Sequence, residues 1–464
     1  MDSKGPSDSL LYKNFDKHPA LVVESGEGIY LKTKDGRRIL DATSGAAVAC
    51  LGYGNSEVQN AVIQQLMDVS YCHPGFYKTQ VAEDLASFLV ESTNGHMSKA
   101  VLCGSGSEAV EVALKLAKTH FAHLENPQFE RTHFIARTGA WHGATLGALT
   151  LSDFRCRKDP FVSMIPQTAS RVSACSTYRG LRDRESEEDY VHRLAQELDD
   201  EFQRIGPERV CAFVAETVGG SASGCAVPVP GYFQAVKHVC KKYNALLILD
   251  EVMCGMGRTG TLHAWEQEGV VPDIQTIGKG LGAGYGPISA VLVNSWLADS
   301  LKKSGKPFAH GQTYMAFPLA AAAALRVQKV ILEKDLVSHV HKMGHYLQRR
   351  LKESLSAHPF VGDIRGRGLF WCVEFVWDKE SKTPFPPSLE MNVRLHARGM
   401  REGYDIALFN ASGTYDGYAG DHILICPPYT VTEEDIEEIV NRVSRVVLDS
   451  FVEIPRNAVP TQSS

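Results

Sequence analysis

The middle of the chain alternates short apolar runs with stretches of helical periodicity. From about Ala100 the apolar runs have the length of buried strands, and apolar positions between several of them recur on one helix face. This alternation predicts a mostly parallel sheet covered by helices, with its ligand at the carboxyl ends of the strands. The predicted strands are Ala100–Cys103, His133–Arg137, Val210–Ala215, Ala245–Leu249, Ile274–Ile277 and Ile288–Val293, and the predicted helices include Ser107–His120 and Gly231–Tyr243.

The N-terminal part of the chain has a different pattern. Residues 1–28 are polar and contain Pro and Gly, which predicts an arm packed on something larger. Gly28–Asp41 predicts a hairpin that turns at Asp35-Gly36, and the Gly-rich Asp41–Gly54 predicts a loop lining a site. The helices predicted next are Ser56–Val69 and Lys78–Glu91.

A smaller α+β unit is predicted in the C-terminal part. The charged stretch Ser176–Arg204 predicts a surface helix, and an Ala-rich helix after Pro318 precedes a second helix through Leu355. The unit itself is predicted from Gly362–Phe375, a helix near Leu389–Gly399, a strand at His422–Cys426 and a closing helix from Thr432. Because 464 residues exceed one ordinary core, we expect an N-terminal arm and part of a small domain in residues 1–60, a large domain in 61–325 and a C-terminal small domain in 326–464.

Composition narrows the class of protein. Hydrophobic residues make up 44% and charged residues 22%, and the net charge is -6, which gives no support for nucleic-acid or anionic-membrane binding. No window approaches about 20 uncharged apolar residues, so no membrane span is expected. The eleven cysteines show no zinc spacing, and an odd count without a secretory leader favours reduced thiols. We expect no metal site and a cytoplasmic location.

Candidate chemistry centres on an acid and a lysine that each follow a predicted strand. Asp250 ends the run from Ala245, and Lys279 stands between Gly278 and Gly280 after the next strand. Pyridoxal phosphate catalysis needs such a pair, with the lysine as Schiff base and the acid on the pyridinium nitrogen. A single lysine is more often a solvated surface residue. However, its flanking glycines would expose this one to a ligand.

Other polar positions support the same kind of site, although each has a commoner explanation alone. The turn at Gly106 and Ser107 opens a helix that could bind phosphate, with Ser107 as N-cap, but such turns without a ligand are at least as common. Trp141 and His142 could face a planar ring or merely pack. The remaining candidates are Glu216, which ends a strand as Asp250 does, and Thr313, which could donate to phosphate or cap a helix.

Together, these segments resemble the class III aminotransferases of the fold-type I pyridoxal-phosphate enzymes. The resemblance rests on LDEV, GRTG and GKGLGAGYGP, on GSGSEAVEVALK, on WHG and on GQTY, and it spans roughly Gly28 to Leu448. It implies an α/β fold with a mostly parallel seven-stranded sheet in a large domain that binds the cofactor, pyridoxal 5'-phosphate, and a smaller α+β domain. It also implies a homodimer in which Gln312 and Thr313 reach the neighbouring site.

The resemblance also assigns roles to residues. Lys279 would be the Schiff-base lysine and proton-transfer base, and Asp250 the partner of the pyridinium nitrogen. The other cofactor contacts that it implies are Val252 and Trp141 on the two ring faces, His142 and Gly143 beside the ring, Gly106 and Ser107 at the phosphate, Glu216 near the cofactor, and Thr313 at the phosphate of the neighbouring subunit.

Departures from the family bear on the substrate. Many members bind a carboxylate with an arginine shortly before the C-terminal Pro-Pro, but here alignment puts Gly417 or Leu424 at that position. Ser221 replaces the gating glutamate of ornithine-type members, and Ala47 stands where a bulky Trp is common. The predicted substrate contacts are Ala47, Tyr77, Trp141 and Ser221. The pocket therefore suits a long or bulky, weakly anionic substrate.

The function predicted from the sequence is a ping-pong aminotransferase. It would move an amino group from an amine or amino acid to a keto acid or aldehyde through Schiff-base chemistry at Lys279. Two alternatives stay open. Decarboxylases, epimerases, aminomutases and lyases share this scaffold and both key residues, and a catalytically silent relative could serve as a scaffold.

Overall fold

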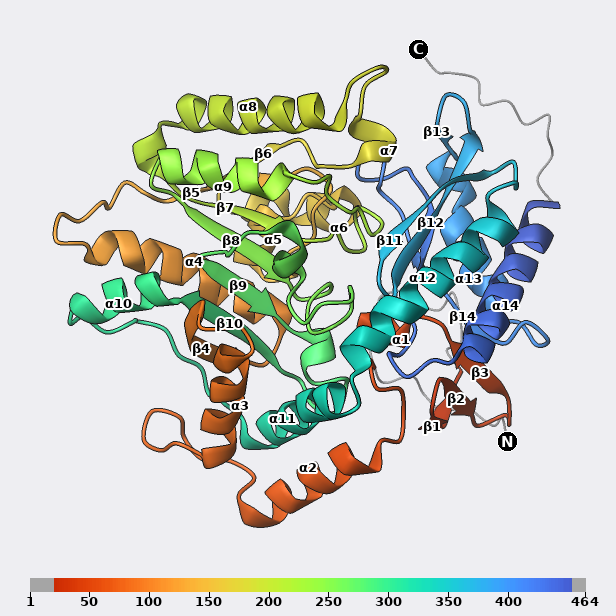
Figure 1. The fold of residues 1–464 in the computed structure, drawn as a ribbon, viewed down its shortest axis with the longest axis horizontal. Coiled ribbons are helices and arrows are strands. Elements are labelled where there is room, and N and C mark those ends of the chain that lie inside the picture. Colours follow the sequence, from red (N-terminus) through yellow and green to blue (C-terminus); the bar gives the residue numbers. More distant parts are fainter. Residues whose placement is uncertain (1–20, 453–464) are drawn as a thin grey trace, which may run out of the picture.

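The computed structural model describes residues 21–452, and a seven-stranded sheet forms its centre (Figure 1). The strand order is β4-β10-β9-β8-β7-β5-β6, and β10 alone runs against its neighbours. This confirms the predicted mostly parallel sheet. The strands are β4 (Met97–Cys103), β5 (His133–Arg137), β6 (Ala169–Val172), β7 (Val210–Glu216), β8 (Leu246–Glu251), β9 (Ile274–Ile277) and β10 (Ser289–Asn294).

Helices cover both faces of this sheet because its strands are apolar on both sides. Phe213 and Ala215 of β7 pack with α8 (Glu187–Ile205) and α9 (Tyr232–Lys242), whereas Ala212 and Val214 pack with α4 (Gly106–His123) on the other face. The other helices around the sheet are α2 (Ser56–Asp68), α3 (Gln80–Glu91), α5 (Leu146–Leu151), α6 (Arg155–Lys158), α7 (Thr177–Gly180), α10 (Ser295–Lys303) and α11 (Pro318–Glu333).

A second unit lies beside the large sheet, on the right in Figure 1. Its sheet has the order β11-β12-β16-β15, with β13 paired to β12. The elements are β11 (Val361–Arg367), β12 (Phe370–Asp378), β13 (Thr383–Pro384), β15 (Phe409–Ala411) and β16 (His422–Ile425), with α12 (Leu336–Leu355), α13 (Met391–Gly399) and α14 (Glu433–Val452). Apolar residues of these helices and strands form one core.

A small sheet joins the start of the described chain to this second unit. β1 (Val23–Glu27), β2 (Tyr30–Thr33) and β3 (Arg38–Asp41) pair in antiparallel fashion, and β14 (Ile406–Ala407) adds to β3 in parallel. The hairpin predicted at Asp35-Gly36 is present between β2 and β3, with Gly36 at φ +87°. Residues 1–20 of the predicted arm lie outside the described residues.

Several local predictions were wrong. β6 was missed because only one of its residues, Val172, is buried, so this edge strand carries no apolar run. β1 lies within the stretch predicted as an arm. Ser107 is not the N-cap of α4; Ser105 is, and its side chain accepts a hydrogen bond from the Glu108 amide at 3.3 Å. Within residues 21–452, no helix is long and apolar enough to cross a membrane.

Candidate active site

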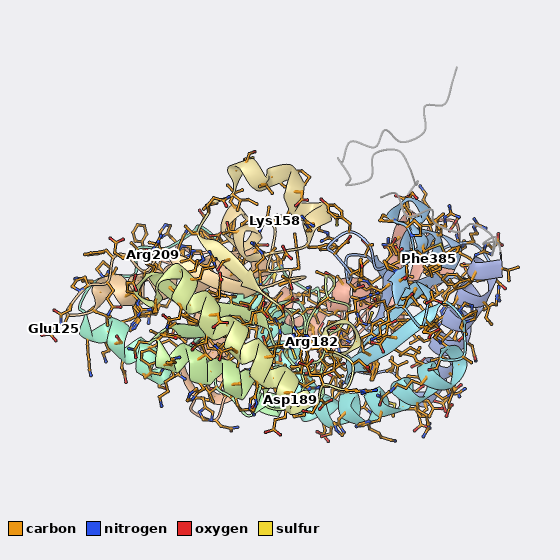
Figure 2. The ribbon with its side chains drawn as sticks, turned by 90° about the horizontal axis from the view of Figure 1, so that it is seen from above. Glu125, Lys158, Arg182, Asp189, Arg209 and Phe385 are labelled. Carbon is orange, nitrogen blue, oxygen red and sulfur yellow. The ribbon has the colours of Figure 1, made fainter. Side chains whose placement is uncertain are left out.

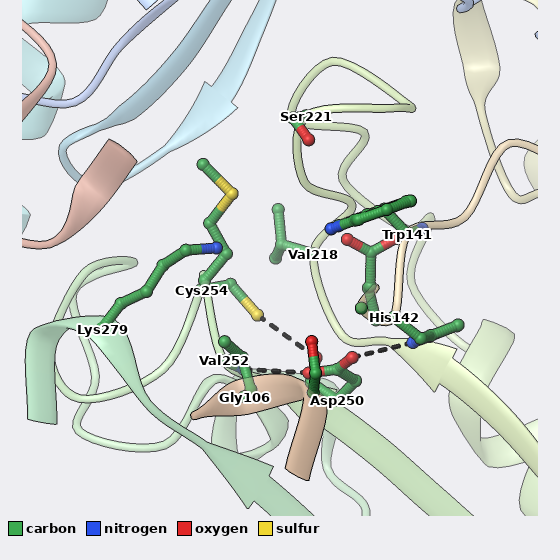
Figure 3. A pocket seen from close by; sticks show the side chains of 13 residues that line it. Gly106, Trp141, His142, Val218, Ser221, Asp250, Val252, Cys254 and Lys279 are labelled. Carbon is green, nitrogen blue, oxygen red and sulfur yellow. Dashed lines mark hydrogen bonds and ion pairs between the residues drawn. The ribbon is translucent and has the colours of Figure 1, made fainter. Parts of the chain in front are cut away.

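A pocket of about 220 Å³ opens at the carboxyl ends of β7 and β8, where the fold class predicts a ligand. In Figure 3, Asp250 and His142 lie together on one side of the pocket, Lys279 lies on another side, and Trp141 lies near Ser221. Its lining residues come from segments far apart in the chain: Gly106, Ser107, Trp141, His142, Gly143, Glu216, Val218, Ser221, Asp250, Val252, Met253, Cys254 and Lys279.

The register of the parallel strands brings the polar groups of the pocket side by side. Asp250 of β8 stands opposite Glu216 of β7 and opposite Thr276 of β9. Its Oδ2 lies 2.7 Å from His142 Nδ1, and its Oδ1 accepts hydrogen bonds of 3.0 Å from the Val252 amide and the Thr276 hydroxyl. Asp250 is therefore held as a fixed acceptor at the end of its strand.

Lys279 has an unusual backbone conformation for a residue with a side chain. Its φ of +44° lies in the left-handed region, which costs about 1 kcal/mol or more and is typical of functional sites. Burial lowers the pKa of its ammonium group, and the nearby Asp250 and Glu216 partly offset this effect. The lowered pKa favours the nucleophilic amine.

The start of α4 provides an anion site. The first N–H groups of a helix have no partner within it, and here they belong to Gly106 and Ser107 in the pocket wall. The Ser107 hydroxyl accepts a hydrogen bond of 3.0 Å from the Ala144 amide, which ties the turn to the segment that carries Trp141. A Cβ added at Gly106 would lie 2.7 Å from Val252 Cγ1, so glycine keeps this space open.

Glu216 connects two loops of the pocket. Its Oε2 accepts a hydrogen bond of 3.3 Å from the Trp141 amide, and its Oε1 accepts one of 2.8 Å from the Gly220 amide. Burial raises the pKa of its carboxyl group, which the nearby His142 partly offsets. Glu216 thereby fixes Trp141 and the loop that bears Ser221.

Four predicted site residues lie outside this pocket. Ala47 is buried beside it, and Tyr77 is 66% exposed. Gln312 Nε2 donates to Glu108 Oε2 at 2.6 Å near the start of α4, and Thr313 lies on the surface, where its carbonyl accepts from the Tyr71 hydroxyl at 3.1 Å. The sequence reasoning missed Val218, Met253 and Cys254 as lining residues. It also missed Thr276, for which the available signal was a hydroxyl residue beside Gln275 in the short buried strand β9.

These residues fit a planar aromatic cofactor with a phosphate arm. Trp141 and Val252 offer an aromatic and an apolar surface, Asp250 an acceptor for a protonated ring nitrogen, and Lys279 an amine for a carbonyl carbon. The phosphate fits the open start of α4, where an added Cβ at Gly143 would lie 2.5 Å from Ser107 Oγ. The fold and the site together define a pyridoxal-phosphate transferase of fold type I.

Comparisons with known proteins give the family. Residues 11–447 match the family described as Aminotransferase class-III, and the chain belongs to this family. An aminotransferase of Gibberella zeae is 47% identical, with 97% of this chain and 88% of the relative covered. The solved omega transaminase of Pseudomonas jessenii in complex with PMP has a TM-score of 0.86 and 31% identity, with 94% of each chain covered.

A third comparison concerns an engineered enzyme. A thermostable omega transaminase variant with one tryptophan replaced by glycine, engineered for asymmetric synthesis of enantiopure bulky amines, has a TM-score of 0.85 and 32% identity, with 93% and 94% of the two chains covered. The predicted fold class, cofactor and reaction class are thus confirmed: the chain is a pyridoxal-phosphate-dependent aminotransferase.

Proposed function

We propose that this aminotransferase takes amino groups from long or bulky, weakly anionic amines and passes them to a keto acid or aldehyde. The observation that carries this proposal is the apolar wall beside the pocket, in which Leu424 is fully buried at one of the positions where many relatives have an arginine. We define the apolar wall as Ala47, Val218, Cys225, Cys254, Ala264, Phe370, Cys372, Leu424 and Cys426.

Each role at the cofactor end follows from the contacts of this chain. Lys279 would hold the cofactor covalently until the donor amine replaces its Nζ, and the freed amine would then take a proton from the donor carbon and pass it on. Asp250 would accept a hydrogen bond from the ring nitrogen and so keep that nitrogen protonated. When bound, pyridoxal phosphate draws electrons from the carbon that carries the amino group, which lets this carbon lose a proton. His142 and Thr276 orient Asp250 for this purpose.

The remaining contacts position the cofactor and the substrate. Trp141 and Val252 would enclose the ring, and the amides of Gly106 and Ser107 would bind the phosphate. Glu216 supports Trp141 through its backbone amide. These groups would fix the ring so that Lys279 reaches one defined carbon.

The substrate end supports a large donor. Ala47 packs in the apolar wall where the family often has a bulky Trp, and Ser221 is a small side chain in the pocket lining. The engineered relative described above, in which a tryptophan became glycine, is a precedent for a small side chain in an enzyme for bulky amines. The transfer of apolar substrate groups from water to an apolar surface is favourable. The apolar wall should therefore bind hydrocarbon groups of a substrate more tightly than charged groups.

A panel of amines tests this proposal. The purified enzyme with pyridoxal phosphate is mixed with amines graded from small α-amino acids to long and aryl-substituted amines, and conversion to the pyridoxamine form is followed by absorbance. We expect the highest kcat/KM for the larger, uncharged amines. A strict preference for small α-amino acids would contradict the proposal.

We further propose a homodimer that completes the pocket. Ligand pockets usually have about 300–1,000 Å³, more than the 220 Å³ that one chain provides. Thr313 lies away from its own pocket, next to exposed apolar side chains suited to a second copy. We define this dimer patch as Ile63, Leu66, Met67, Tyr71, Phe76, Tyr77 and Tyr314. In the dimer, Gln312 and Thr313 would reach the neighbouring phosphate, and Tyr77 the neighbouring substrate.

Two measurements test the dimer. Light scattering should give twice the mass of one chain, and Met67→Asp should shift the protein towards monomers because it places a charge in the dimer patch. Thr313→Ala should weaken cofactor binding roughly 10-fold or more, the usual effect of losing a hydrogen bond to a charged group. A monomer with full activity would rule the proposal out.

Two further proposals concern the whole chain. Most of its eleven cysteines are buried free thiols, which suits a reducing compartment, and we place the protein in the cytoplasm. We also propose the domain limits given above, with a cofactor-binding domain in residues 61–325 between segments 1–60 and 326–464. Limited proteolysis with mass spectrometry would test these limits.

A further inference from the structure

The side chain of Arg157 lies in an unusual environment for a cation. It lies on α6, half-buried, with its guanidinium 5.1 Å from the ring centre of Trp141 and 5.0 Å from that of Phe154. Its backbone amide donates to the Phe154 carbonyl at 3.0 Å, but within residues 21–452 its guanidinium forms no ion pair and no hydrogen bond. A guanidinium stays charged in proteins, so this is a partly desolvated cation without a counter-ion beside a ring that lines the pocket.

The segment that carries Arg157 packs against Gly417, one of the two positions at which many class III aminotransferases have an arginine. A Cβ added at Gly417 would lie 2.4–2.9 Å from side-chain carbons of Arg155, and the Cys156 amide donates to the Gly417 carbonyl at 3.4 Å. Leu424, at the other aligned position, is buried in the apolar wall. Figure 2 shows the segment with Lys158 rising from the large sheet unit, beside the unit that carries Phe385. Arg157 of α6 therefore places a cation next to Trp141 of the pocket lining, whereas the strand before Pro427 carries no Arg or Lys.

We propose that Arg157 is a specificity-determining residue that binds the carboxylate of the keto-acid acceptor at the Trp141 side of the pocket. This inference rests on the proposed function, because a ping-pong aminotransferase holds its donor and its acceptor in the same pocket. A bulky amine needs the apolar wall, whereas a keto acid also needs a cation. The apolar wall reaches the pocket lining at Val218 and Cys254, and Arg157 lies next to Trp141 of the same lining.

The chemistry of Arg157 suits this role. Its planar fork presents paired N–H donors that match a carboxylate, and stacking on aromatic faces leaves those edge donors accessible. The cation-π contact with Trp141 holds the charge in place when an uncharged amine occupies the pocket. Arg155 differs in that its side chain is exposed and lies over Tyr418, with 5.6 Å between guanidinium and ring centre.

The test compares acceptors that differ only in the carboxylate. The pyridoxamine form of the holoenzyme is mixed with 2-oxobutanoate or with propanal, which lacks the carboxylate. In Arg157→Gln, we expect the KM for the keto acid to rise roughly 10- to 100-fold, as for loss of a charge-assisted hydrogen bond, and the values for propanal to change less than about 2-fold. Arg157→Lys should recover part of the loss. Arg155→Gln is the matched control and should resemble the wild type.

A binding measurement separates this inference from the proposed function. Butanoate, which cannot react, is titrated calorimetrically into the holoenzyme, and 1-butanol serves as the uncharged control. Wild type should bind butanoate roughly 10-fold more tightly than Arg157→Gln does, with no difference for 1-butanol. Equal butanoate affinity in both proteins, or equal losses with keto acid and aldehyde, would overturn the role of Arg157. An enzyme that transfers no amino group from any amine would overturn the proposed function alone.

Discussion

The two ends of the pocket are built in different ways. At the cofactor end, one oxygen of Asp250 accepts hydrogen bonds from Thr276 of the neighbouring strand β9 and from the Val252 amide, and His142 contacts its other oxygen. At the proposed substrate end, the residues of the apolar wall, all within residues 21–452, pack together without polar contacts between their side chains, and the carbonyl of Ser221 accepts a hydrogen bond from His422 Nε2 at 2.8 Å. Strand register fixes the first end, whereas side-chain packing between distant segments forms the second.

This difference separates the reaction from its specificity. A change at Asp250 disturbs a hydrogen-bonded set in which every partner depends on the others. A change in the apolar wall alters volume and polarity, and volume-conserving changes there cost little stability. Substitutions in the apolar wall can therefore alter the pocket while the contacts of Asp250 stay the same. Substitutions at the two ends should therefore differ in which amines they affect as well as in the size of their effect on the rate.

The largest effect is expected at Lys279. In Lys279→Ala the amine that moves the proton is gone, so the rate of amino transfer should fall by about 10³-fold or more for every amine. Rapid mixing of the enzyme with an excess of the donor amine measures this rate. Lys303→Ala, an exposed lysine, is the control and should keep the wild-type rate. A Lys279→Ala enzyme within about 10-fold of wild type would contradict the assignment.

The next effect is expected at Asp250. Asp250→Asn keeps an oxygen that can accept from Val252 and Thr276 but removes the charge that would hold the ring nitrogen protonated. The rate should fall roughly 10²- to 10³-fold, as when a preorganised electrostatic partner is lost, with similar losses for small and bulky amines. Circular dichroism and bound-cofactor absorbance serve as controls for folding. Losses confined to bulky amines would place Asp250 at the wrong end of the pocket.

The cofactor end was largely predictable from the sequence. Glu216, Asp250 and Lys279 each follow a short apolar run, and the rule that strand ends share one edge of a sheet puts them together. The cap of α4 was not predictable, because Ser105 and Ser107 stand in the same Gly/Ser-rich turn. Only the backbone conformation decides that Ser105 caps the helix.

The substrate end was much less predictable. Ala47 and Leu424 share the apolar wall although the whole large sheet separates them in the chain. No local pattern links such positions. The position of Arg157 over Trp141 depends likewise on the turn after α5, whose path a single sequence does not specify. Packing across long sequence separations, rather than local propensity, determines this part of the molecule.

A change at Ser221 tests the substrate end directly. Ser221→Leu keeps the carbonyl that accepts from His422 but adds hydrocarbon to the pocket lining. We expect kcat/KM for bulky amines to fall roughly 10-fold and that for small amines to change less than about 2-fold, because steric discrimination acts on size alone. Ser221→Ala is the control. Equal losses for both classes of amine would mean that the two ends are coupled.

The smallest effect on activity is expected at Asp421, next to His422 on the substrate side. Burial raises the pKa of Asp421 from 3.8 to about 6. The folded state therefore favours the neutral carboxyl, so this contribution to stability is complete below about pH 3.8 and is lost as the pH rises through about 6. The loss amounts to at most about 3 kcal/mol.

Asp421→Asn removes this loss because its side-chain oxygen can still accept from the Asn392 amide, which lies at 3.3 Å. The free energy of unfolding in urea should therefore exceed that of the wild type at pH 7, and the difference should vanish near pH 4. Asp299→Asn, at an exposed position, should show no such trend. Rates with small and bulky amines should both stay unchanged, since Asp421 touches neither end of the pocket. A variant less stable than wild type at pH 7 would show that the charged carboxylate stabilises the strand that holds Ser221.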